Sequence, residues 1–524
     1  MAGALDPTGE RIWWFDDERG DEFGRWIVDP FEPGEPHVAA PQIPPAYSLG
    51  LAIGRDFAVI GSSTDDGTTA HVVRDGRSPE LIYRHLAEAN VAGLSRDEQL
   101  LCLSHSEHGD SLHPALRVVD LDGKPQSELW DGPGKGLWAG EWCPVPGDQR
   151  LLVMHEREGH YRPLIWDLWT GEPTEIAIDL PGEVGASWYP DGTALLMFHH
   201  HRGRTQLYRY EVSPGELEPV HTERGTIAGA RVRPDGEVWY AVTRASTPTE
   251  VRSNEEVLLQ PPGGPGPGGV EYFDREIGQI HVFVAEPDGR ERPRPTIFQV
   301  HGGPHYQDRD EFSPKVQAWV DHGFAVVLVN YRGSTGYGRS WRDALQGKPG
   351  FTELEDIARV QDALVAEGVV DPGRCVLAGT SWGGYLTLLG LGTQPERWSL
   401  GIAAVPVADY MVAFEDEMEP LKSFDRALFG GSPDELPALY RERSPITYIE
   451  RVVVPVMILA GENDPRCPIR QIEHYIAKLE ELGKPHEVYR YDAGHGSLVI
   501  DESIRQLEIQ LAFASRYLGT PAPR

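Results

Sequence analysis

A serine between two glycines follows a short apolar run in the C-terminal half of the chain. Ser381 is the central residue of Gly379-Thr380-Ser381-Trp382-Gly383, directly after residues 375–378. This Gly-X-Ser-X-Gly spacing is typical of a nucleophile elbow, a sharp strand-to-helix turn that exposes the serine hydroxyl. Side chains two residues before or after the serine would collide in such a turn, so both positions favour glycine. Taken alone, the same pattern is also found in ordinary tight turns.

A serine hydroxyl is a weak nucleophile and needs a base and an orienting acid. Asp464 follows the apolar run 454–461, and His495 lies between glycines just after the predicted strand 487–491. The chain order Ser, Asp, His is that of α/β-hydrolases. We therefore predict a triad of Ser381, Asp464 and His495. Asp492 is a competing acid, although the tight loop that joins it to the histidine makes the required geometry awkward.

A glycine-rich loop supplies the fourth part of the predicted site. His301-Gly302-Gly303-Pro304 follows the predicted strand 295–300. The tetrahedral intermediate of acyl transfer needs preorganised backbone N–H donors for its oxyanion, and glycine lets the backbone come close. We predict that the oxyanion hole consists of the backbone amides of Gly303 and Trp382.

Short apolar strands alternate with helical patterns from residue 270 to 524, which predicts a doubly wound, mostly parallel α/β-hydrolase sheet. The predicted strands lie near 295–300, 325–330, 375–380, 401–405, 455–460 and 487–491, and the predicted helices near 313–322, 352–367, 382–393, 469–482 and 501–517. Residues 263–269 consist of proline and glycine only and predict a linker between this domain and the preceding one.

Residues 1–262 repeat a turn between two strand-like runs. The clearest copies are Pro190-Asp191-Gly192 and Pro234-Asp235-Gly236, and four weaker copies precede them. A period of about 40 to 50 residues built from short strands is the signature of propeller blades. The copies predict an all-β propeller of six blades, with seven possible, and a pair of β-sandwiches is the alternative.

Composition limits the classes of partner. The net charge of −33 argues against nucleic acid and anionic membranes. No apolar run approaches the length of a membrane span, and the first residues lack the pattern of a signal peptide. The four cysteines have neither metal nor disulfide spacing. We therefore expect a cytoplasmic protein with reduced thiols, without cofactor or metal. The run His199-His200-His201 does not indicate a metal site, because adjacent residues on a strand point to opposite faces.

The C-terminal half resembles the prolyl oligopeptidase family (S9) of serine peptidases, and most closely its acylaminoacyl-peptidase and dipeptidyl-aminopeptidase-like branch. The segments that carry the resemblance are 301–304, 330–338, 379–385, 461–464 and 494–496, of which Asn330-Tyr331-Arg332-Gly333-Ser334 is specific to this family. The resemblance implies that the propeller restricts access to short substrates. It also implies a possible homo-oligomer.

Three further site residues follow from the resemblance. Arg466 matches an arginine that holds a substrate carbonyl, while Tyr385 and Val407 match positions that border the pocket for the residue before the cleaved bond. The acidic run 414–419 is a candidate anchor for a free substrate amine, or else solvated surface.

Together these observations predict a serine exopeptidase that hydrolyses short peptides or N-blocked aminoacyl substrates, as an aminopeptidase or an acylaminoacyl-peptidase. A carboxylesterase or small-molecule amidase is the alternative, because ester and amide hydrolysis share the tetrahedral intermediate.

Overall fold

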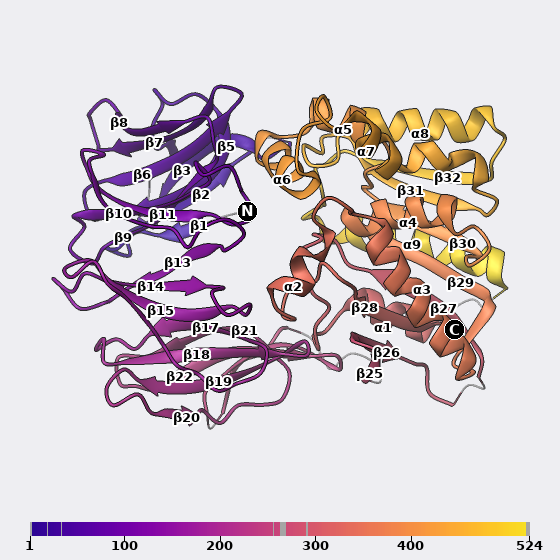
Figure 1. The fold of residues 1–524 in the computed structure, drawn as a ribbon, viewed down its shortest axis with the longest axis horizontal. Helices are drawn as coiled ribbons and strands as arrows, with labels where there is room; N and C mark the ends of the chain where they lie inside the picture. Colours follow the sequence, from indigo (N-terminus) through magenta and orange to yellow (C-terminus); the bar gives the residue numbers. More distant parts are fainter. Residues whose placement is uncertain are drawn as a thin grey trace.

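The computed structural model describes residues 3–17, 19–32, 34–254, 256–262, 269–289 and 292–519. Nearly all of the predicted linker, residues 263–268, lies outside these ranges. Figure 1 shows two halves side by side, with antiparallel sheets on the left and a helix-covered sheet on the right. In the described part, every helix is too short or too polar to cross a bilayer.

In the described N-terminal half, antiparallel strands form one eight-stranded sheet and four four-stranded sheets. The first contains β1 (Gly3–Leu5), β2 (Arg11–Asp16), β3 (Phe23–Pro30), β4 (His37–Val38), β5 (Ala46–Ile53), β6 (Ala58–Thr64), β7 (Gly67–Val73) and β8 (Glu80–His85). A two-residue pairing of β3 with β5 joins its two halves.

The four-stranded sheets follow in chain order. They are β9 (Ala89–Leu94), β10 (Leu100–His105), β11 (Ala115–Asp120) and β12 (Pro125–Leu129); β13 (Leu137–Trp142), β14 (Arg150–His155), β15 (Arg162–Asp167) and β16 (Pro173–Glu175); β17 (Glu183–Trp188), β18 (Ala194–His201), β19 (Arg204–Glu211) and β20 (Leu217–Pro219); and β21 (Thr226–Val232), β22 (Val238–Arg244), β23 (Thr247–Arg252) and β24 (Val257–Leu259).

The repeating aspartate turn has a structural reason. Asp191 lies between β17 and β18, where its carboxylate accepts the backbone N–H of Thr193 (3.0 Å). Asp235 does the same between β21 and β22, with Glu237 (3.1 Å). Such side-chain bonds to the backbone two residues on stabilise tight turns. Because a separate apolar cluster fills the space between each sheet and the next, the arrangement is propeller-like.

The C-terminal half contains one eight-stranded sheet in the order β25-β26-β28-β27-β29-β30-β31-β32. Its strands are β25 (Phe273–Ile277), β26 (Ile280–Ala285), β27 (Arg294–Val300), β28 (Ala325–Asn330), β29 (Val370–Thr380), β30 (Leu400–Ala404), β31 (Val456–Gly461) and β32 (His486–Tyr491). The pairings of β26 with β25 and β28 are antiparallel and the others are parallel. The sequence patterns did not reveal the β25–β26 hairpin.

Helices cover both faces of this sheet (Figure 1). They are α1 (Pro314–Asp321), α2 (Arg339–Arg342), α3 (Phe351–Ala366), α4 (Trp382–Thr393), α5 (Tyr410–Asp416), α6 (Glu419–Phe429), α7 (Pro437–Arg443), α8 (Ile469–Glu481) and α9 (Ile500–Leu518). Successive side chains of β29 point to opposite faces of the sheet and so reach both helix layers. Leu377 packs with α3, α4 and α8 on one face, and Val376 packs with α1 and α9 on the other.

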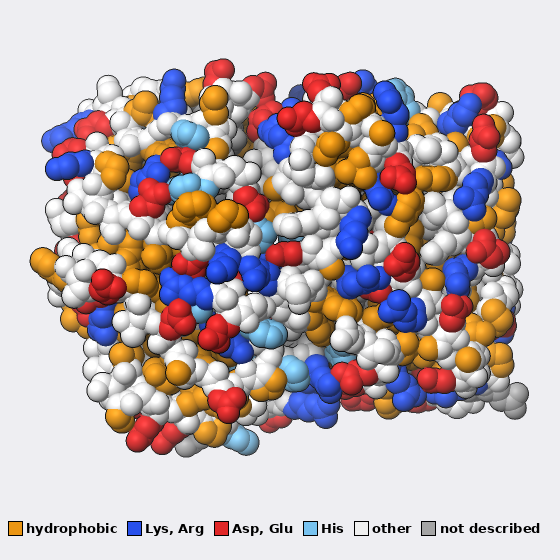
Figure 2. Space-filling model, viewed as in Figure 1, with side chains coloured by type: hydrophobic (Ala, Val, Ile, Leu, Met, Phe, Trp, Pro, Cys, Tyr) orange, Lys and Arg blue, Asp and Glu red, His pale blue; other side chains and the backbone are white. Residues whose placement is uncertain are grey.

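The two halves are held together by buried polar contacts. Arg342 of α2 donates to Glu156 of the propeller-like domain (Nη2–Oε2 3.0 Å), and His113 contacts Asp343 (3.0 Å). On the face drawn in Figure 2, side chains of both halves meet along the middle, with acidic and basic groups interspersed.

Candidate active site

Ser381 lies at the turn from β29 into α4 with φ 58° and ψ −120°. A non-glycine residue at positive φ is strained, and such strain persists only where the surroundings enforce it. The packing does so here. A Cβ on Gly379 would lie 2.3 Å from the Gly383 carbonyl carbon, and one on Gly383 would lie 2.1 Å from the Val300 carbonyl oxygen. The elbow geometry therefore depends on both glycines.

Asp464 and His495 are brought together from loops beyond β31 and β32. The distance from His495 Nδ1 to Asp464 Oδ2 is 2.7 Å. Asp464 Oδ1 accepts the backbone N–H groups of Arg466 (2.8 Å) and Cys467 (3.0 Å), so both carboxylate oxygens are engaged. The competing acid, Asp492, instead accepts from Asn463 (2.9 Å). Asp464 is thus fixed where it can orient the imidazole.

Cys467 completes this cluster, and its place was not foreseen beyond its closeness to Asp464 in sequence. Its sulfur lies within 4.8 Å of donor atoms of Asp464 and His495. Burial raises the pKa of the Cys467 thiol well above its usual value, although the Ser381 side chain lowers it. A protonated thiol is a poor metal ligand, so the chemistry of this trio favours a hydrogen-bonded triad over a metal centre.

The predicted oxyanion loop lies against the elbow. A Cβ on Gly302 would be 3.4 Å from the Ser381 Cβ and 3.9 Å from the Trp382 backbone nitrogen. Gly303 has φ +117°, a conformation that favours glycine. Tyr331 stacks on the buried His301 ring (centroids 4.2 Å apart) and donates to the His301 carbonyl oxygen (2.8 Å). This packing fixes the loop beside the serine.

A buried glutamate that the sequence patterns did not single out supports Trp382. Glu353 of α3 is fully buried, and its carboxylate accepts the indole N–H of Trp382 (3.1 Å) and the backbone N–H of Gly350 (2.7 Å). Burial raises the pKa of Glu353 to about 7. The contact ties Trp382, the residue after Ser381, to the helix layer beneath it.

The three residues expected to contact substrate lie in different environments. Arg466 forms a two-pronged ion pair with Glu22 of the propeller-like domain (2.6 and 3.0 Å). Tyr385 is fully buried and Val407 is 7% exposed, both within the apolar core beneath the elbow. Arg466 faces the space between the domains, whereas Tyr385 packs below it.

A cavity of about 590 Å³ lies between the two domains beside His495. It is lined by Trp14, Phe15, Asp16, Asp17, Gly20, Glu22, Tyr47 and Ser48 from the N-terminal half and by Met418, Arg466, His495, Gly496, Ser497 and Leu498 from the C-terminal half. Glu22 is paired with Arg466, while Asp16 and Asp17 form no ion pair within the described residues. The cavity therefore has an excess of carboxylates.

The acidic run 414–419 divides into two parts. Glu415 and Asp416 pair with Arg470 (2.6 and 2.5 Å) at the surface of the hydrolase domain. Glu417 is buried, at 5% exposure. The run thus presents no cluster of free carboxylates to the cavity.

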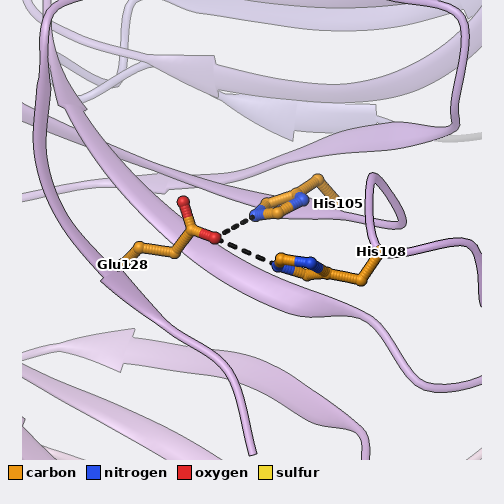
Figure 3. Close-up of side chains that lie close together, drawn as sticks. All are labelled: His105, His108 and Glu128. Carbon is orange, nitrogen blue, oxygen red and sulfur yellow. Dashed lines mark hydrogen bonds and ion pairs between the residues drawn. The ribbon is translucent and has the colours of Figure 1, made fainter. Parts of the chain in front are cut away.

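A second group of possible ligands lies in the N-terminal half (Figure 3). Glu128 Oε1 is 3.1 Å from His108 Nε2 and 3.8 Å from His105 Nε2, and its other oxygen accepts from Arg117 (2.7 Å). The backbone N–H of Glu107 donates to His105 Nδ1 (3.4 Å), which leaves the ring proton on the nitrogen that a metal would need. These contacts favour a polar cluster over a metal site.

The comparisons with known proteins fit this geometry. The sequence model of the prolyl oligopeptidase family matches residues 310–521, the segment that contains Ser381, Asp464 and His495. This segment belongs to the prolyl oligopeptidase family. The match confirms the resemblance that the sequence predicted, and the curated relatives include proteins named as peptidases.

Curated relatives include an uncharacterized peptidase, YuxL, of Bacillus subtilis, with 27% identity over 59% of this chain and 49% of the relative. The acylamino-acid-releasing enzyme of Rattus norvegicus is 26% identical over 63% and 51%. Dipeptidyl aminopeptidase BIII of Pseudoxanthomonas mexicana is 26% identical over 72% and 56%. The chain thus spans about half the length of these relatives.

Solved structures share the fold along the whole chain. A puromycin hydrolase superposes with a TM-score of 0.82 and 22% identity, over 99% of this chain and 86% of its own. The acylaminoacyl peptidase of Pyrococcus horikoshii superposes with a TM-score of 0.72 and 18% identity, over 100% and 89%. The architecture is therefore an α/β-hydrolase domain preceded by a propeller domain.

Proposed function

We propose that the protein is a serine exopeptidase that hydrolyses short peptides through Ser381, His495 and Asp464. The observation that carries the proposal is the 2.7 Å contact of His495 with a doubly anchored Asp464, together with a serine held at positive φ in the elbow. Acyl transfer needs this combination of an exposed nucleophile, an oriented base and a buried acid.

In the proposed reaction, His495 takes the Ser381 proton as Oγ attacks the substrate carbonyl. Asp464 stabilises the imidazolium, and the backbone amides of Gly303 and Trp382 donate to the oxyanion. His495 then protonates the leaving amine. Water, activated by the same histidine, hydrolyses the acyl-enzyme and regenerates the serine.

The cavity favours a substrate with a free amino terminus. Asp16 and Asp17 carry negative charge beside His495. Arg466, the one arginine among the lining residues, is paired with Glu22. A protonated amine gains from carboxylates in such a partly enclosed site. Arg466 becomes available to a substrate carbonyl only when its pair with Glu22 opens, which is the acylaminoacyl-peptidase alternative. A carboxylesterase on the same scaffold is the remaining alternative.

The N-terminal domain is proposed to have six blades and to act as a size filter. Its 24 described strands support a count of six groups of four. The boundaries 1–262, 263–269 and 270–524 remain predictions, as do a cytoplasmic location and a homo-oligomer.

One comparison tests the proposal: kcat/KM for an aromatic aminoacyl p-nitroanilide with a free amine and with an N-acetyl group, with Ser381→Ala as the blank. We expect the free amine to be preferred. Preference for the acetylated form would make the enzyme an acylaminoacyl-peptidase. Turnover of a short ester but neither anilide would replace the peptidase with an esterase.

A further inference from the structure

Glu353 is a fully buried carboxyl group at the start of α3. It is the third residue of the helix, and its Oε2 accepts the backbone N–H of Gly350, the residue that precedes the helix (2.7 Å). This bond is half of a capping box, which satisfies a free N–H at a helix start. Capping uses one oxygen only, and a glutamine side chain also supplies one acceptor oxygen. Because burying a carboxyl group is costly, its presence here needs a further reason.

The second oxygen of Glu353 faces the elbow. Oε1 accepts the indole N–H of Trp382 (3.1 Å), and Trp382 is the first residue of α4, directly after Ser381. Both oxygens of Glu353 therefore act as acceptors for two N–H groups from different segments. A carboxylate can accept at both oxygens, whereas an amide has one acceptor oxygen and a second group that only donates. The need for a carboxyl group thus comes from the bond to Trp382.

Packing on the other side limits where the indole of Trp382 can lie. The ring of Tyr385, one turn along α4, meets the indole edge to face with the ring centroids 5.0 Å apart. The start of α3 packs against the same tyrosine, because a Cβ on Gly350 would lie 2.2 Å from the Tyr385 hydroxyl oxygen. Trp382 itself is 5% exposed. The indole is therefore held between Tyr385 and the carboxyl group of Glu353.

The backbone of Trp382 carries the part of the residue that the proposed reaction uses. Its amide lies in the first turn of α4, where backbone N–H groups have no acceptor within the helix. A Cβ on Gly302 would lie 3.9 Å from this nitrogen, so the amide borders the predicted oxyanion loop. A donor to the oxyanion is effective only where its geometry is set before the reaction. A bond that fixes the indole therefore also fixes the amide of the same residue.

We propose that Glu353 is a positioning residue of the oxyanion hole. Through the indole N–H of Trp382, it holds the backbone amide of that residue where the amide can donate to the tetrahedral intermediate. The inference rests on the proposed function and adds a residue outside the triad to it. The effect of Glu353 should appear in kcat rather than in KM, because the intermediate needs this donor more than the bound substrate does.

The experiment measures kcat and KM for the preferred p-nitroanilide in three variants. Glu353→Gln removes one acceptor oxygen, Trp382→Phe removes the indole N–H but keeps an aromatic ring, and the third variant carries both changes. Each single change should lower kcat by about 10- to 30-fold and leave KM within about twofold, since complete loss of an oxyanion donor costs about 10²- to 10³-fold. Both changes remove the same contact, so the double variant should be at most about threefold slower than the slower single variant.

Gln361→Leu is the matched control. Gln361 lies further along α3, is 3% exposed and donates to the Arg397 carbonyl oxygen (2.9 Å) rather than to the elbow. This variant should have a lower melting temperature and a kcat within about twofold of the wild type. Two readouts separate positioning from loss of folded protein. The final extent of fluorophosphonate labelling counts active sites, and the Ki of phenylboronic acid, which forms a tetrahedral adduct with serine, should rise in Glu353→Gln as kcat/KM falls.

An unchanged kcat per labelled site in Glu353→Gln would overturn the inference and leave Glu353 as the cap of α3. Effects that multiply in the double variant would also overturn it, because the two residues would then act separately. If Glu353→Gln fails to fold, Trp382→Phe decides, and a kcat within twofold of the wild type refutes the inference. A wild type that the fluorophosphonate does not label would refute the proposed function itself. If the wild type cleaves only a short ester, the same ratios are measured with that ester.

Discussion

Ser381 and His495, the proposed nucleophile and base, are held in different ways. Ser381 is enclosed within one domain, where the Gly383 carbonyl and the end of β27 leave no room for side chains on the flanking glycines. His495 lies on a loop that packs against the other domain. A Cβ on Gly494 would lie 1.8 Å from the carbonyl oxygen of Gly20, in the β2–β3 loop of the N-terminal domain. Arg466, near the same loop, is paired with Glu22.

This difference indicates that the C-terminal domain builds the elbow by itself, whereas the histidine depends on contact between domains. Interfaces between domains open at lower free energy than domain cores. Separation of the domains would therefore displace His495 before it displaces Ser381. If the domains open to admit substrate, the same movement would also take the proposed triad apart. The following predictions test this contrast.

Removal of the proposed nucleophile should give the largest effect on activity. Ser381→Ala should lower kcat by roughly 10⁴- to 10⁶-fold, because the triad acts as a unit. The melting temperature should stay close to that of the wild type. Rates on a p-nitroanilide and labelling by a fluorophosphonate probe check both parts; residual activity above a hundredth of the wild type would exclude Ser381 as the nucleophile.

A larger side chain at the contact between the two domains should displace His495. Gly494→Ala places a methyl group against the Gly20 carbonyl, and we expect kcat to fall by about 100-fold, the cost of a misplacement of about 1 Å. Gly496→Ala is the matched control, because its Cβ would meet nothing within 4 Å. Fluorophosphonate labelling should slow only in the first variant. Equal rates in the two variants would mean that the domain contact does not position His495.

The contribution of Glu353, beneath the elbow, to protein stability should depend on pH. The raised pKa of Glu353 means that its contribution to stability is complete below about pH 4.5 and is lost as pH rises through about 7. Glu353→Gln should flatten the fall in melting temperature over this window. It should also cost on the order of 1 kcal/mol at low pH, because an amide cannot accept both hydrogen bonds. Melting curves of both proteins between pH 5 and 8 test this; parallel curves would contradict it.

Removal of the ion pair between Glu22 and Arg466 should give the smallest effect. Glu22→Gln removes an exposed pair whose contribution to stability is below about 1 kcal/mol. We expect an unchanged melting temperature and a change of KM of only a few-fold, with N-acetylated substrates gaining relative to free amines. Asp75→Asn, which removes an exposed pair with Arg11 outside the cavity lining, should leave KM unaltered.

The sequence patterns predicted most of the catalytic domain. The strands and helices that carry Ser381, Asp464 and His495 lie where the alternation of apolar runs predicted them. The helices α5 to α7 were missed because their short, mixed sequences have no clear period. Glu353 and Cys467 were missed as parts of the site, because contacts between distant segments give them their roles.

Glycine spacing and strand ends are local properties of the chain, so they were enough to predict the elbow, the candidate triad and the repeated turns of the N-terminal half. The contacts of Gly20 and Glu22 with the histidine side of the site, and the burial of Glu417 and Asp425, come from the packing of distant segments. Proximity between segments far apart in the chain depends on how whole domains pack. No local pattern contains that information.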